Sequence, residues 1–381
     1  MPELVALDLP GGAGFVDALR AIWDTGDAAA PIDPRLPAEA RAKVLAALRP
    51  SRIVASDGEI HSVADGLPVE EGDALVVATS GSSGRPKGVV LTHDAISSSA
   101  GATTERLGVD RDRHTWLACL PLAHIGGLSV VTRALLTGTP LMVLPGFVAE
   151  TVEELGRSGR VTHVSLVATA LGRLDPSVFT TVLLGGSQPP GELPANAVVT
   201  YGMTETGSGV MYDGVPLDDV EVAIAHFDDD TAEGEILIRA PMLMRCYRDG
   251  ETGRVMGPDG SRTWFGSGDG GYLNDDGKLI VSGRLAEVIN TGGEKVWPDA
   301  VELVLLSHPG VAEAGVWKRS DPEWGERVVA WVVPLAARPN PEDLKELVAS
   351  LVAPWAAPKE IVFTDGLPRT PSGKLRRRDL A

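Results

Sequence analysis

The most informative segment of this chain reads Thr79-Ser80-Gly81-Ser82-Ser83-Gly84-Arg85-Pro86-Lys87-Gly88-Val89. An apolar run at residues 74–78 precedes it and predicts a buried strand, and a helix is expected to begin near His93-Asp94. The glycines and serines leave the backbone free to curl around an anion, which exposed N–H groups, hydroxyls and Lys87 can then bind. The segment therefore predicts a phosphate-binding loop.

Two other interpretations of this segment are weaker. The Walker loop needs a glycine just before its lysine and a hydroxyl just after it, whereas Pro86 precedes Lys87 here and Gly88 follows it. The other alternative is a flexible Gly/Ser connector. It is disfavoured because connectors seldom lie between an apolar strand and a helix, or carry a Pro-Lys-Gly sequence.

Composition limits the class of protein. The chain has 381 residues, of which 44% are hydrophobic, so it can form a large core and more than one domain. Its formal net charge of −18 argues against nucleic acid or an anionic membrane surface as a partner. Any anionic substrate must therefore be held by a local cluster of positive groups. The sequence leaves the oligomeric state open.

The sequence carries no sign of export or membrane insertion. Met1-Pro2-Glu3 lacks a basic region, and no apolar stretch is long enough to span a membrane. Cys119 and Cys246 cannot form a disulfide framework and have no metal-ligand spacing, so both are expected to be buried, unreactive thiols. We therefore expect a cytoplasmic protein.

The central part of the chain predicts an α/β architecture. Between about residues 74 and 201, strand-like runs alternate with helical patterns, which is typical of a mostly parallel sheet covered by helices. These runs are residues 115–120, 141–144, 161–166, 181–184 and 197–200. In such sheets the ligand binds at the carboxyl ends of the strands, so the loops at these ends are expected to share one cleft.

The remaining parts of the chain have other patterns. Residues 1–72 read as helices with a small hairpin at 51–62, and they carry no recognisable chemistry. Residues 205–282 contain short strands separated by turn signals, which indicates antiparallel structure. A change of pattern then places a domain boundary at 283/284. We expect 1–283 to form a large N-terminal domain and 284–381 a compact α+β domain.

Four further segments combine glycine with charged or hydroxyl side chains. They read Tyr201-Gly202-Met203-Thr204-Glu205-Thr206, Gly266-Ser267-Gly268-Asp269-Gly270-Gly271, Gly283-Arg284-Leu285-Ala286-Glu287-Val288-Ile289-Asn290-Thr291-Gly292-Gly293-Glu294-Lys295-Val296-Trp297-Pro298 and Pro368-Arg369-Thr370-Pro371-Ser372-Gly373-Lys374-Leu375. Some have an ordinary explanation when taken alone, such as a polar turn, a Gly-Asp hairpin or a solvated basic tail. Their order after a phosphate loop is far more specific.

This set of motifs resembles the adenylate-forming superfamily, which contains acyl-CoA synthetases, adenylation domains and luciferases. The resemblance extends from residue 79 to residue 378. It implies an α/β fold, in which a large N-terminal domain has helix-covered, mostly parallel sheets plus a β-rich subdomain, and a small C-terminal α+β domain acts as a mobile lid. It also implies ATP and CoA as co-substrates, Mg²⁺ as cofactor and a carboxylic acid as the molecule that is activated.

The resemblance implies roles for individual residues. ATP or AMP is expected to contact Thr79, Ser80, Gly81, Ser82, Ser83, Gly84, Lys87, Gly185, Gly186, Ser187, Tyr201, Gly202, Asp269 and Arg284. Tyr201 can stack on adenine, Thr204 can donate to the α-phosphate, and Glu205 can bind the metal ion. Asp269 and Arg284 are expected at the ribose.

Lys374 is expected to carry the first chemical step. A lysine that bridges the carboxylate of the acid and the α-phosphate draws two anions together and offsets the charge at the pentavalent phosphorus. Three arginines follow: Arg376, Arg377 and Arg378. An ordinary solvated tail and a contact with a CoA phosphate are equally supported interpretations of these residues.

The segment at residues 283–298 contains the hinge between the two domains that the resemblance implies, and we call it the hinge segment. It is expected to serve the second step, in which the thiol of CoA reacts. Gly292, Gly293 and Lys295 are the residues that the resemblance assigns to it. Ala286 departs from the family pattern, which has an aspartate or a lysine two positions after Arg284. The means by which the closed states are stabilised is therefore open.

The acyl group is expected to bind near Pro121-Leu122-Ala123-His124-Ile125-Gly126-Gly127. His124 precedes a predicted helix and can hydrogen-bond a substrate carboxylate or keto group, with a structural capping histidine as the alternative. Gly185-Gly186-Ser187-Gln188 resembles a strand-end loop that flanks adenine and the acyl group, so Gln188 is a second candidate. Three other side chains are expected to have only surface or packing roles: His93, Arg133 and His163.

The resemblance implies an ATP-dependent acid–CoA ligase. A carboxylate attacks the α-phosphate of ATP, pyrophosphate leaves, and a thiol displaces AMP from the acyl-adenylate. The short N-terminal part and the segment at 120–128 resemble the 2-succinylbenzoate–CoA ligases (o-succinylbenzoyl-CoA synthetases) of actinobacterial menaquinone biosynthesis. Another short aryl- or acyl-CoA ligase, an amide-forming ligase and a non-catalytic acyl or nucleotide sensor remain open.

Overall fold

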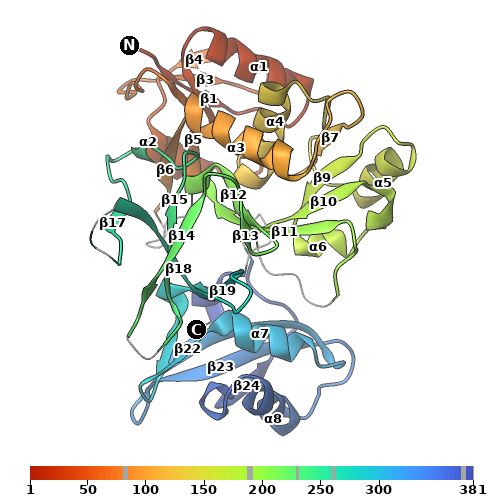
Figure 1. Cartoon of the computed structure of the whole chain (residues 1–381), viewed down its shortest axis with the longest axis vertical. Coiled ribbons are helices and arrows are strands. Elements are labelled where there is room, and N and C mark those ends of the chain that lie inside the picture. Colours follow the sequence, from red (N-terminus) through yellow and green to blue (C-terminus); the bar gives the residue numbers. More distant parts are fainter. Residues whose placement is uncertain are drawn as a thin grey trace. The chain divides into compact units, whose positions relative to one another are not determined.

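The computed structural model of the chain describes residues 1–79, 85–186, 192–228, 231–258, 260, 263–369 and 375–380. The chain divides into two compact units (Figure 1). The first unit contains Met1–Pro189, Leu193–Ala223 and Leu237–Gly266, and the second contains Pro190–Glu192, Ile224–Ile236 and Ser267–Ala381. Each unit has a hydrophobic core of its own. The boundary expected at 283/284 stays a prediction.

The first sheet has the strand order β16-β6-β5-β2-β1-β3-β4. Its strands are β1 (Leu4–Leu7), β2 (Ala28–Pro31), β3 (Arg52–Val54), β4 (Ile60–Ser62), β5 (Asp73–Thr79), β6 (Lys87–Thr92) and β16 (Cys246–Tyr247). Three helices of the same region are α1 (Ala13–Asp24), α2 (Ala38–Leu48) and α3 (His93–Arg106). The predicted hairpin at 51–62 is confirmed as β3 and β4. The prediction for 1–72 is wrong in omitting β1 and β2, which are fully buried, parallel strands without the alternation that marks a half-exposed strand.

The predicted phosphate-binding segment joins two strands of this sheet. β5 and β6 are antiparallel, and Thr79 pairs with Lys87 where the two strands meet the segment. The strand predicted at 74–78 is confirmed as β5, while β6 lies between the segment and the predicted helix. That helix, α3, begins at His93, and the Thr92 side chain caps it by accepting a hydrogen bond of 3.1 Å from the Ala95 N–H.

The second sheet confirms the predicted parallel sheet and has the strand order β13-β12-β11-β10-β9-β7-β8. Its strands are β7 (Trp116–Ala118), β8 (Leu141–Val143), β9 (His163–Leu166), β10 (Thr181–Leu184), β11 (Ala197–Met203), β12 (Ser208–Tyr212) and β13 (Val215–Pro216). The strands from β8 to β11 are parallel, and β12 and β13 are antiparallel additions. The helices of this region are α4 (Ile125–Thr137), α5 (Ala149–Arg157) and α6 (Ala168–Leu171).

A third sheet has the order β14-β15-β18-β17, with β19 paired to β18. Its strands are β14 (Glu221–His226), β15 (Gly234–Arg239), β17 (Arg254–Met256), β18 (Thr263–Leu273) and β19 (Leu279–Arg284). The pairs β17/β18 and β18/β19 are antiparallel, as predicted for this part of the chain. Glycine favours the tight turns that join neighbouring antiparallel strands, which explains the turn signals in this part of the sequence.

The fourth sheet, in the second unit, has the order β21-β20-β23-β22, with β24 paired to β23. Its strands are β20 (Ile289–Thr291), β21 (Glu294–Val296), β22 (Val311–Asp321), β23 (Gly325–Pro334) and β24 (Glu360–Phe363), and the helices are α7 (Pro298–Leu306) and α8 (Pro341–Leu351). Val301 and Leu305 of α7 and Leu344 of α8 are fully buried against the sheet. This arrangement confirms the small α+β part of the predicted fold.

The two cysteines differ in environment. Cys119 is fully buried, and burial raises the pKa of its thiol to about 12. Cys246 lies in the edge strand β16 and is only half-buried, so the prediction of a buried thiol is wrong for this residue, although partial burial still raises its pKa. Among the described residues, no helix combines the length and the apolar character that crossing a bilayer requires.

Candidate active site

Three of the predicted site segments follow parallel strands of the second sheet. His124 comes after β7, Gly185 and Gly186 come after β10, and Thr204 comes directly after β11. Because the carboxyl ends of parallel strands meet at one edge of a sheet, these segments lie along the same edge. The fold therefore gathers, at one edge, residues that are separated by up to 80 positions in the sequence.

The turn that carries Thr204 and Glu205 is fixed by its neighbours. It forms the short helix η2 (Thr204–Thr206), in which the buried Thr206 hydroxyl accepts from the Met203 N–H at 2.9 Å and donates to the Ser208 carbonyl at 2.6 Å. A Cβ at Gly202 would lie 2.2 Å from the Ser208 carbonyl oxygen, so this position requires glycine. The spacing of the motif thus follows from the packing of the β11–β12 connection.

Glu205 and Lys87 are linked through a tyrosine that sequence patterns do not single out. The Tyr247 hydroxyl donates to Oε1 of Glu205 at 2.8 Å, and Nζ of Lys87 lies 4.6 Å from the centroid of the Tyr247 ring. Lys87 also forms a 2.7 Å ion pair with Glu251, which holds the pKa of Lys87 above its usual value. Tyr247 is close to both because β16 pairs with β6, with Tyr247 opposite Val89.

Part of the predicted site falls outside the described residues. These positions are Ser80, Gly81, Ser82, Ser83, Gly84, Ser187, Gln188 and Lys374. The described residues that flank them are Thr79 and Lys87 on the first sheet and Gly185 and Gly186 after β10. Gly186 has a φ of +91°, a backbone conformation that favours glycine.

Arg133 of α4 is a fully buried cation on the helix that follows His124. Its Nη2 atom donates to the Ser208 hydroxyl at 3.2 Å, and its guanidinium carbon lies 4.7 Å from the Trp116 ring centroid. Its Nε and Nη1 atoms have no hydrogen-bond partner among the described residues. Burial lowers the pKa of Arg133. Arg133 does not lie on the surface, and packing alone does not explain a buried guanidinium with unpartnered nitrogens.

A neutral histidine, His163, also contacts Trp116. The ring centroid of His163 is 5.0 Å from that of Trp116, and the side chain is buried. Burial, with the nearby His114 and Arg133, lowers the pKa of His163 to about 4. His163 therefore stays uncharged at neutral pH and adds no positive charge beside Arg133, which agrees with its predicted packing role.

His124 occupies the N-cap position of α4 and is about half exposed. Its Nε2 atom lies 3.9 Å from Oδ2 of Asp33, a buried carboxylate. Arg35 donates to both carboxylate oxygens of Asp33, at 2.9 and 2.7 Å, and this holds the pKa of Asp33 below its usual value. The side chain makes no capping hydrogen bond to the first turn of α4 as far as the described residues show, and a contact between His124 and the substrate stays a prediction.

In the second unit, strand pairing joins two of the predicted motifs. Asp269 of β18 pairs with Arg284 of β19, and Oδ1 of Asp269 lies 2.8 Å from Nε of Arg284. The Asp269 side chain is almost fully buried, whereas that of Arg284 is more than half exposed. A Cβ at Gly283, where φ is +146°, would lie 2.7 Å from Oδ2 of Asp299. The two residues expected at the ribose are therefore neighbours.

Gly292 and Gly293 of the hinge segment favour glycine for different physical reasons. At Gly292 a Cβ would lie 2.5 Å from the ring of Trp324, an exposed indole at the β22–β23 turn, and φ is +62°. At Gly293 there is space for a Cβ, but φ is +92°, so the backbone alone favours glycine. Nζ of Lys295 lies 3.8 Å from the centroid of the Phe227 ring.

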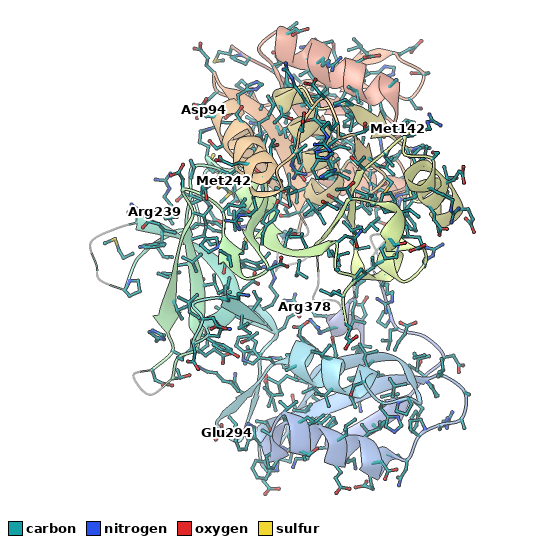
Figure 2. All side chains as sticks on the ribbon, turned by 45° about the vertical axis from the view of Figure 1, so that its right-hand side comes forward. Asp94, Met142, Arg239, Met242, Glu294 and Arg378 are labelled. Atoms are coloured by element: carbon teal, nitrogen blue, oxygen red, sulfur yellow. The ribbon has the colours of Figure 1, made fainter. Side chains whose placement is uncertain are left out.

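Arg377 corrects the prediction of a solvated basic tail. Its side chain is only 11% exposed, and its Nε and Nη2 atoms contact the two carboxylate oxygens of Glu302 at 2.8 and 2.6 Å. It also pairs with Asp299 at 2.6 Å and with Glu287 of the hinge segment. Arg377 therefore ties the C-terminal turn η5 (Arg377–Leu380) to α7 and to the hinge segment, near the Arg378 label in Figure 2.

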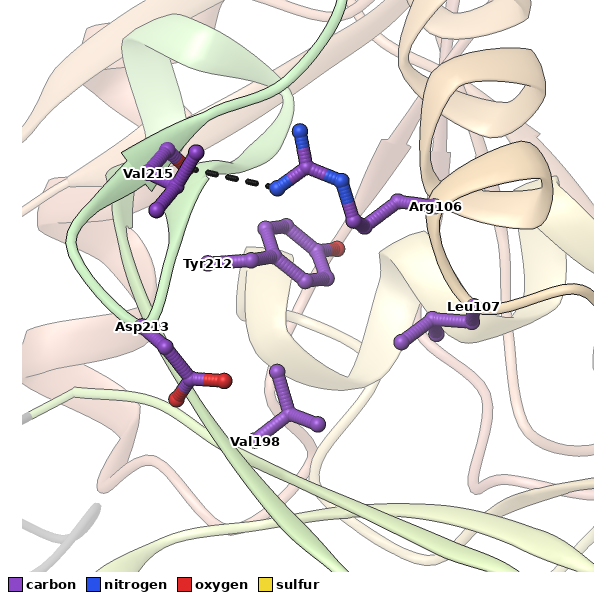
Figure 3. A pocket seen from close by; sticks show the side chains of 6 residues that line it. All are labelled: Arg106, Leu107, Val198, Tyr212, Asp213 and Val215. Carbon is purple, nitrogen blue, oxygen red and sulfur yellow. Dashed lines mark hydrogen bonds between the residues drawn. The ribbon is translucent and has the colours of Figure 1, made fainter.

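Figure 3 shows a surface pocket of the first unit. Its lining consists of Arg106, Leu107, Val198, Tyr212, Asp213 and Val215. The predicted site residues that the structure describes are not among them. The Tyr212 hydroxyl is within 2.9 Å of the Thr103 hydroxyl, so this tyrosine belongs to the packing between α3 and β12.

Comparisons with known proteins define the family of this chain. The family model of the AMP-binding enzymes matches residues 68–248, and that of the AMP-binding enzyme C-terminal domain matches residues 300–374. A 2-succinylbenzoate–CoA ligase of Bacillus anthracis is 31% identical over 99% of this chain and 88% of its own length. A relative of the same name from Bacillus cytotoxicus is 35% identical over 80% of this chain and 69% of its own length.

Two solved structures share the fold over nearly the whole chain. The o-succinylbenzoate CoA synthetase of Bacillus subtilis, in complex with the acyl-adenylate intermediate, superposes with a TM-score of 0.86 at 28% identity and covers 99% of this chain and 88% of its own. An amide bond synthetase from Marinactinospora thermotolerans has a TM-score of 0.86 at 25% identity, with coverage of 100% and 90%.

The fold and the strand-end motifs define an enzyme that activates a carboxyl group with ATP. The chain belongs to the AMP-binding enzyme family. Within that family, its class is that of the AMP-forming acid–CoA ligases.

Proposed function

We propose that the protein is a 2-succinylbenzoate–CoA ligase of menaquinone biosynthesis, acting in the cytoplasm. The acid and ATP form an acyl-adenylate and pyrophosphate, and CoA then gives 2-succinylbenzoyl-CoA and AMP. The curated relatives and the Bacillus subtilis structure support this choice of acid. The observation that carries it is the buried Arg133, for the following reason.

In a dicarboxylate substrate, one carboxylate does not react, and the protein must supply a cation to pair with it. One carboxylate is converted to the mixed anhydride, and the other keeps its negative charge inside the protein. Arg133 is fully buried and keeps two guanidinium nitrogens without a hydrogen-bond partner among the described residues. A buried charge is strongly unfavourable unless it is paired, so this arrangement supports an anionic ligand group. Arg133 follows the His124 segment, expected at the acyl group, on the same helix.

The other residues would supply binding and electrostatic stabilisation. Thr204 is proposed to donate to the α-phosphate, and Asp269 and Arg284 to bind the ribose. Lys374 is proposed to bridge the attacking carboxylate and the α-phosphate, which lowers the barrier to their approach. In the second step the thiol attacks the acyl carbon, and the bond from that carbon to the phosphate oxygen breaks. Gly292 and Gly293 would let the backbone approach the thiol closely.

Glu205 fits the cofactor that this reaction implies. Mg²⁺ in nucleotide sites is usually held by one or two carboxylates together with phosphate oxygens and water. Glu205 offers one carboxylate at the strand-end edge, oriented by the Tyr247 hydroxyl at 2.8 Å. The described residues contain no cluster of three or more His, Cys, Asp and Glu that could hold a metal ion without substrate. When bound, the ion would neutralise charge on the phosphates.

An amide-forming ligase is the second candidate. The amide bond synthetase has the same TM-score as the succinylbenzoate enzyme, so the fold itself does not decide between a thiol and an amine as the acceptor. Both candidates share the adenylation step. They differ only in the molecule that displaces AMP.

A substrate panel tests the proposal directly. Pyrophosphate release is measured with ATP, Mg²⁺ and either 2-succinylbenzoate, benzoate, a medium-chain fatty acid or an amino acid. Each acid is tested with CoA, with an amine in place of CoA, and with neither. We expect 2-succinylbenzoate to give the highest kcat/KM by at least tenfold, and CoA to convert a stoichiometric burst into continuous turnover. Turnover that needs an amine and ignores CoA would favour the second candidate. ATP binding without turnover on any acid would contradict both.

A further inference from the structure

Glu251 is an anionic partner of Lys87 in the part of the chain that the structure describes. Its Oε2 atom lies 2.7 Å from Nζ of Lys87, a distance typical of a charge-assisted hydrogen bond. The same ammonium group lies 4.6 Å from the Tyr247 ring centroid. Lys87 is therefore held between an anion and an aromatic face, although it belongs to the segment expected to bind ATP phosphates.

A tight turn places Glu251 beside Lys87. The Tyr247 N–H donates to the Glu251 carbonyl at 2.6 Å, and Gly250, with a φ of +91°, lets the chain reverse between them. Oδ1 of Asp249 accepts from the Glu251 N–H at 3.2 Å. Because Tyr247 is paired to β6, the turn is fixed to the same strand that carries Lys87. The fold therefore places the Glu251 side chain within reach of Lys87.

The ion pair is weak enough to be exchanged. The side chain of Lys87 is 35% exposed and that of Glu251 is 64% exposed. Water screens such pairs, so they contribute little to stability. A triphosphate brings several negative oxygens to the same ammonium group and can replace one carboxylate. Tyr247 can keep Lys87 in position during the exchange, because the ring contact does not involve Glu251.

We propose that Glu251 is an internal competitor of the triphosphate for Lys87, and that it lowers the affinity for ATP and promotes the release of pyrophosphate. The proposal rests on the proposed function, since it assumes that Lys87 contacts ATP phosphates. Pyrophosphate carries the β- and γ-phosphates of ATP. When it leaves, Lys87 would otherwise lose its anionic partner, whereas Glu251 can take that place at once. Neutralising Glu251 should therefore strengthen binding, the opposite of what removing a substrate-binding residue does.

Isothermal titration of the full chain with ATP, pyrophosphate and AMP tests the competition. Each ligand is titrated at the same Mg²⁺ concentration and without acid, using the wild type and Glu251→Gln. We expect ATP and pyrophosphate to bind Glu251→Gln two- to fivefold more tightly, where fivefold equals about 1 kcal/mol, the upper range for an exposed ion pair. AMP lacks the β- and γ-phosphates, so its affinity should differ by less than about 1.5-fold between Glu251→Gln and the wild type.

Asp249→Asn is the matched control. It removes one negative charge from the same turn, and Asp249 acts on Lys87 through its electric field. Asparagine can keep the turn, because its side-chain oxygen also accepts from an N–H. We expect its effect on ATP affinity to be less than half that of Glu251→Gln. Glu251→Asp, which keeps the charge on a shorter side chain, should lie between the wild type and Glu251→Gln.

The outcomes separate this inference from the proposed function. A wild-type protein that does not bind ATP contradicts the proposed function. A wild type that binds ATP, with Glu251→Gln binding ATP equally or more weakly, overturns the competition and makes Glu251 part of the nucleotide site or of the turn. Equal strengthening of ATP and AMP would also overturn it, because the effect would then not involve the β- and γ-phosphates.

Discussion

Replacing Lys374 with alanine should slow adenylate formation by about 100- to 1,000-fold, the loss usually seen when one group that stabilises developing charge is removed. The carboxylate of the acid and the α-phosphate repel each other, and the proposed lysine is the cation that would bridge them. Lys374 lies outside the described residues, but its flanks are placed: Arg369 pairs with Leu375, and the Arg376 N–H donates to the Pro368 carbonyl at 2.9 Å. Pre-steady-state measurement of acid-dependent pyrophosphate release gives the rate of this step.

The second half-reaction is the internal control for Lys374. When chemically prepared acyl-adenylate and CoA are supplied, Lys374→Ala should form the thioester within a few-fold of the wild-type rate, because no attack on phosphorus is needed. Lys345→Ala removes a positive charge from the surface of α8, where Lys345 pairs with Glu342, and it should leave both steps within about twofold of the wild type. Equal losses in the two steps would contradict the role given to Lys374 and indicate a structural one.

Replacing Arg133 with methionine should lower kcat/KM for 2-succinylbenzoate by about 100-fold, since truncating one member of a buried charge pair usually costs 2–5 kcal/mol. The loss should appear mainly in KM for the acid, because the contact is made in the ground state and the transition state alike. For benzoate, which has no second carboxylate, the same substitution should change kcat/KM by less than about fivefold, since no pair is broken. Steady-state kinetics with both acids measures this split.

Stability provides a second readout for Arg133. Methionine is apolar and of similar length, and replacing an incompletely paired buried ion with such a residue is often neutral or stabilising. Arg133→Met should therefore unfold at the wild-type temperature or above it when no acid is present. In the wild type, saturating acid should raise the unfolding temperature, and this increase should be largely lost in the variant. If the variant loses activity equally on both acids and also unfolds earlier, Arg133 is a packing residue.

The fold was predictable where the sequence carries a repeating pattern. The alternation of apolar runs and helical stretches between 74 and 201 predicted the parallel sheet, because consecutive parallel strands need crossover connections, which are usually helices. The strands β1 and β2 were not predicted, for a physical reason. Each has four residues, all of them buried and apolar, and such a short run looks the same in a buried helix and in a central strand. Only the pairing with distant strands defines them.

The site was predictable where glycine and charged residues occur at fixed spacing within one segment. Tyr247 and Glu251 carry no such signal, because strand pairing and a turn bring them to the site from distant positions. Glu251 is about 160 residues from Lys87 in the sequence, and Tyr247 is about 40 residues from Glu205. Arg133 sits in an apolar helix, where one arginine reads as an ordinary surface residue. Its burial, and the ion-pair cluster of Arg377, depend on tertiary packing and could not be read from local composition.

The central claim is that a carboxylate oxygen of the acid attacks the α-phosphorus of ATP. Turnover of 2-succinylbenzoate that carries ¹⁸O in its carboxyl groups, with ATP and CoA, tests this most directly, with mass spectrometry of the products. When the thiol displaces AMP, the oxygen that joined acid and phosphorus stays on phosphorus, so AMP should carry one ¹⁸O atom and pyrophosphate none. Label in pyrophosphate or inorganic phosphate, or unlabelled AMP beside a formed thioester, would contradict the account.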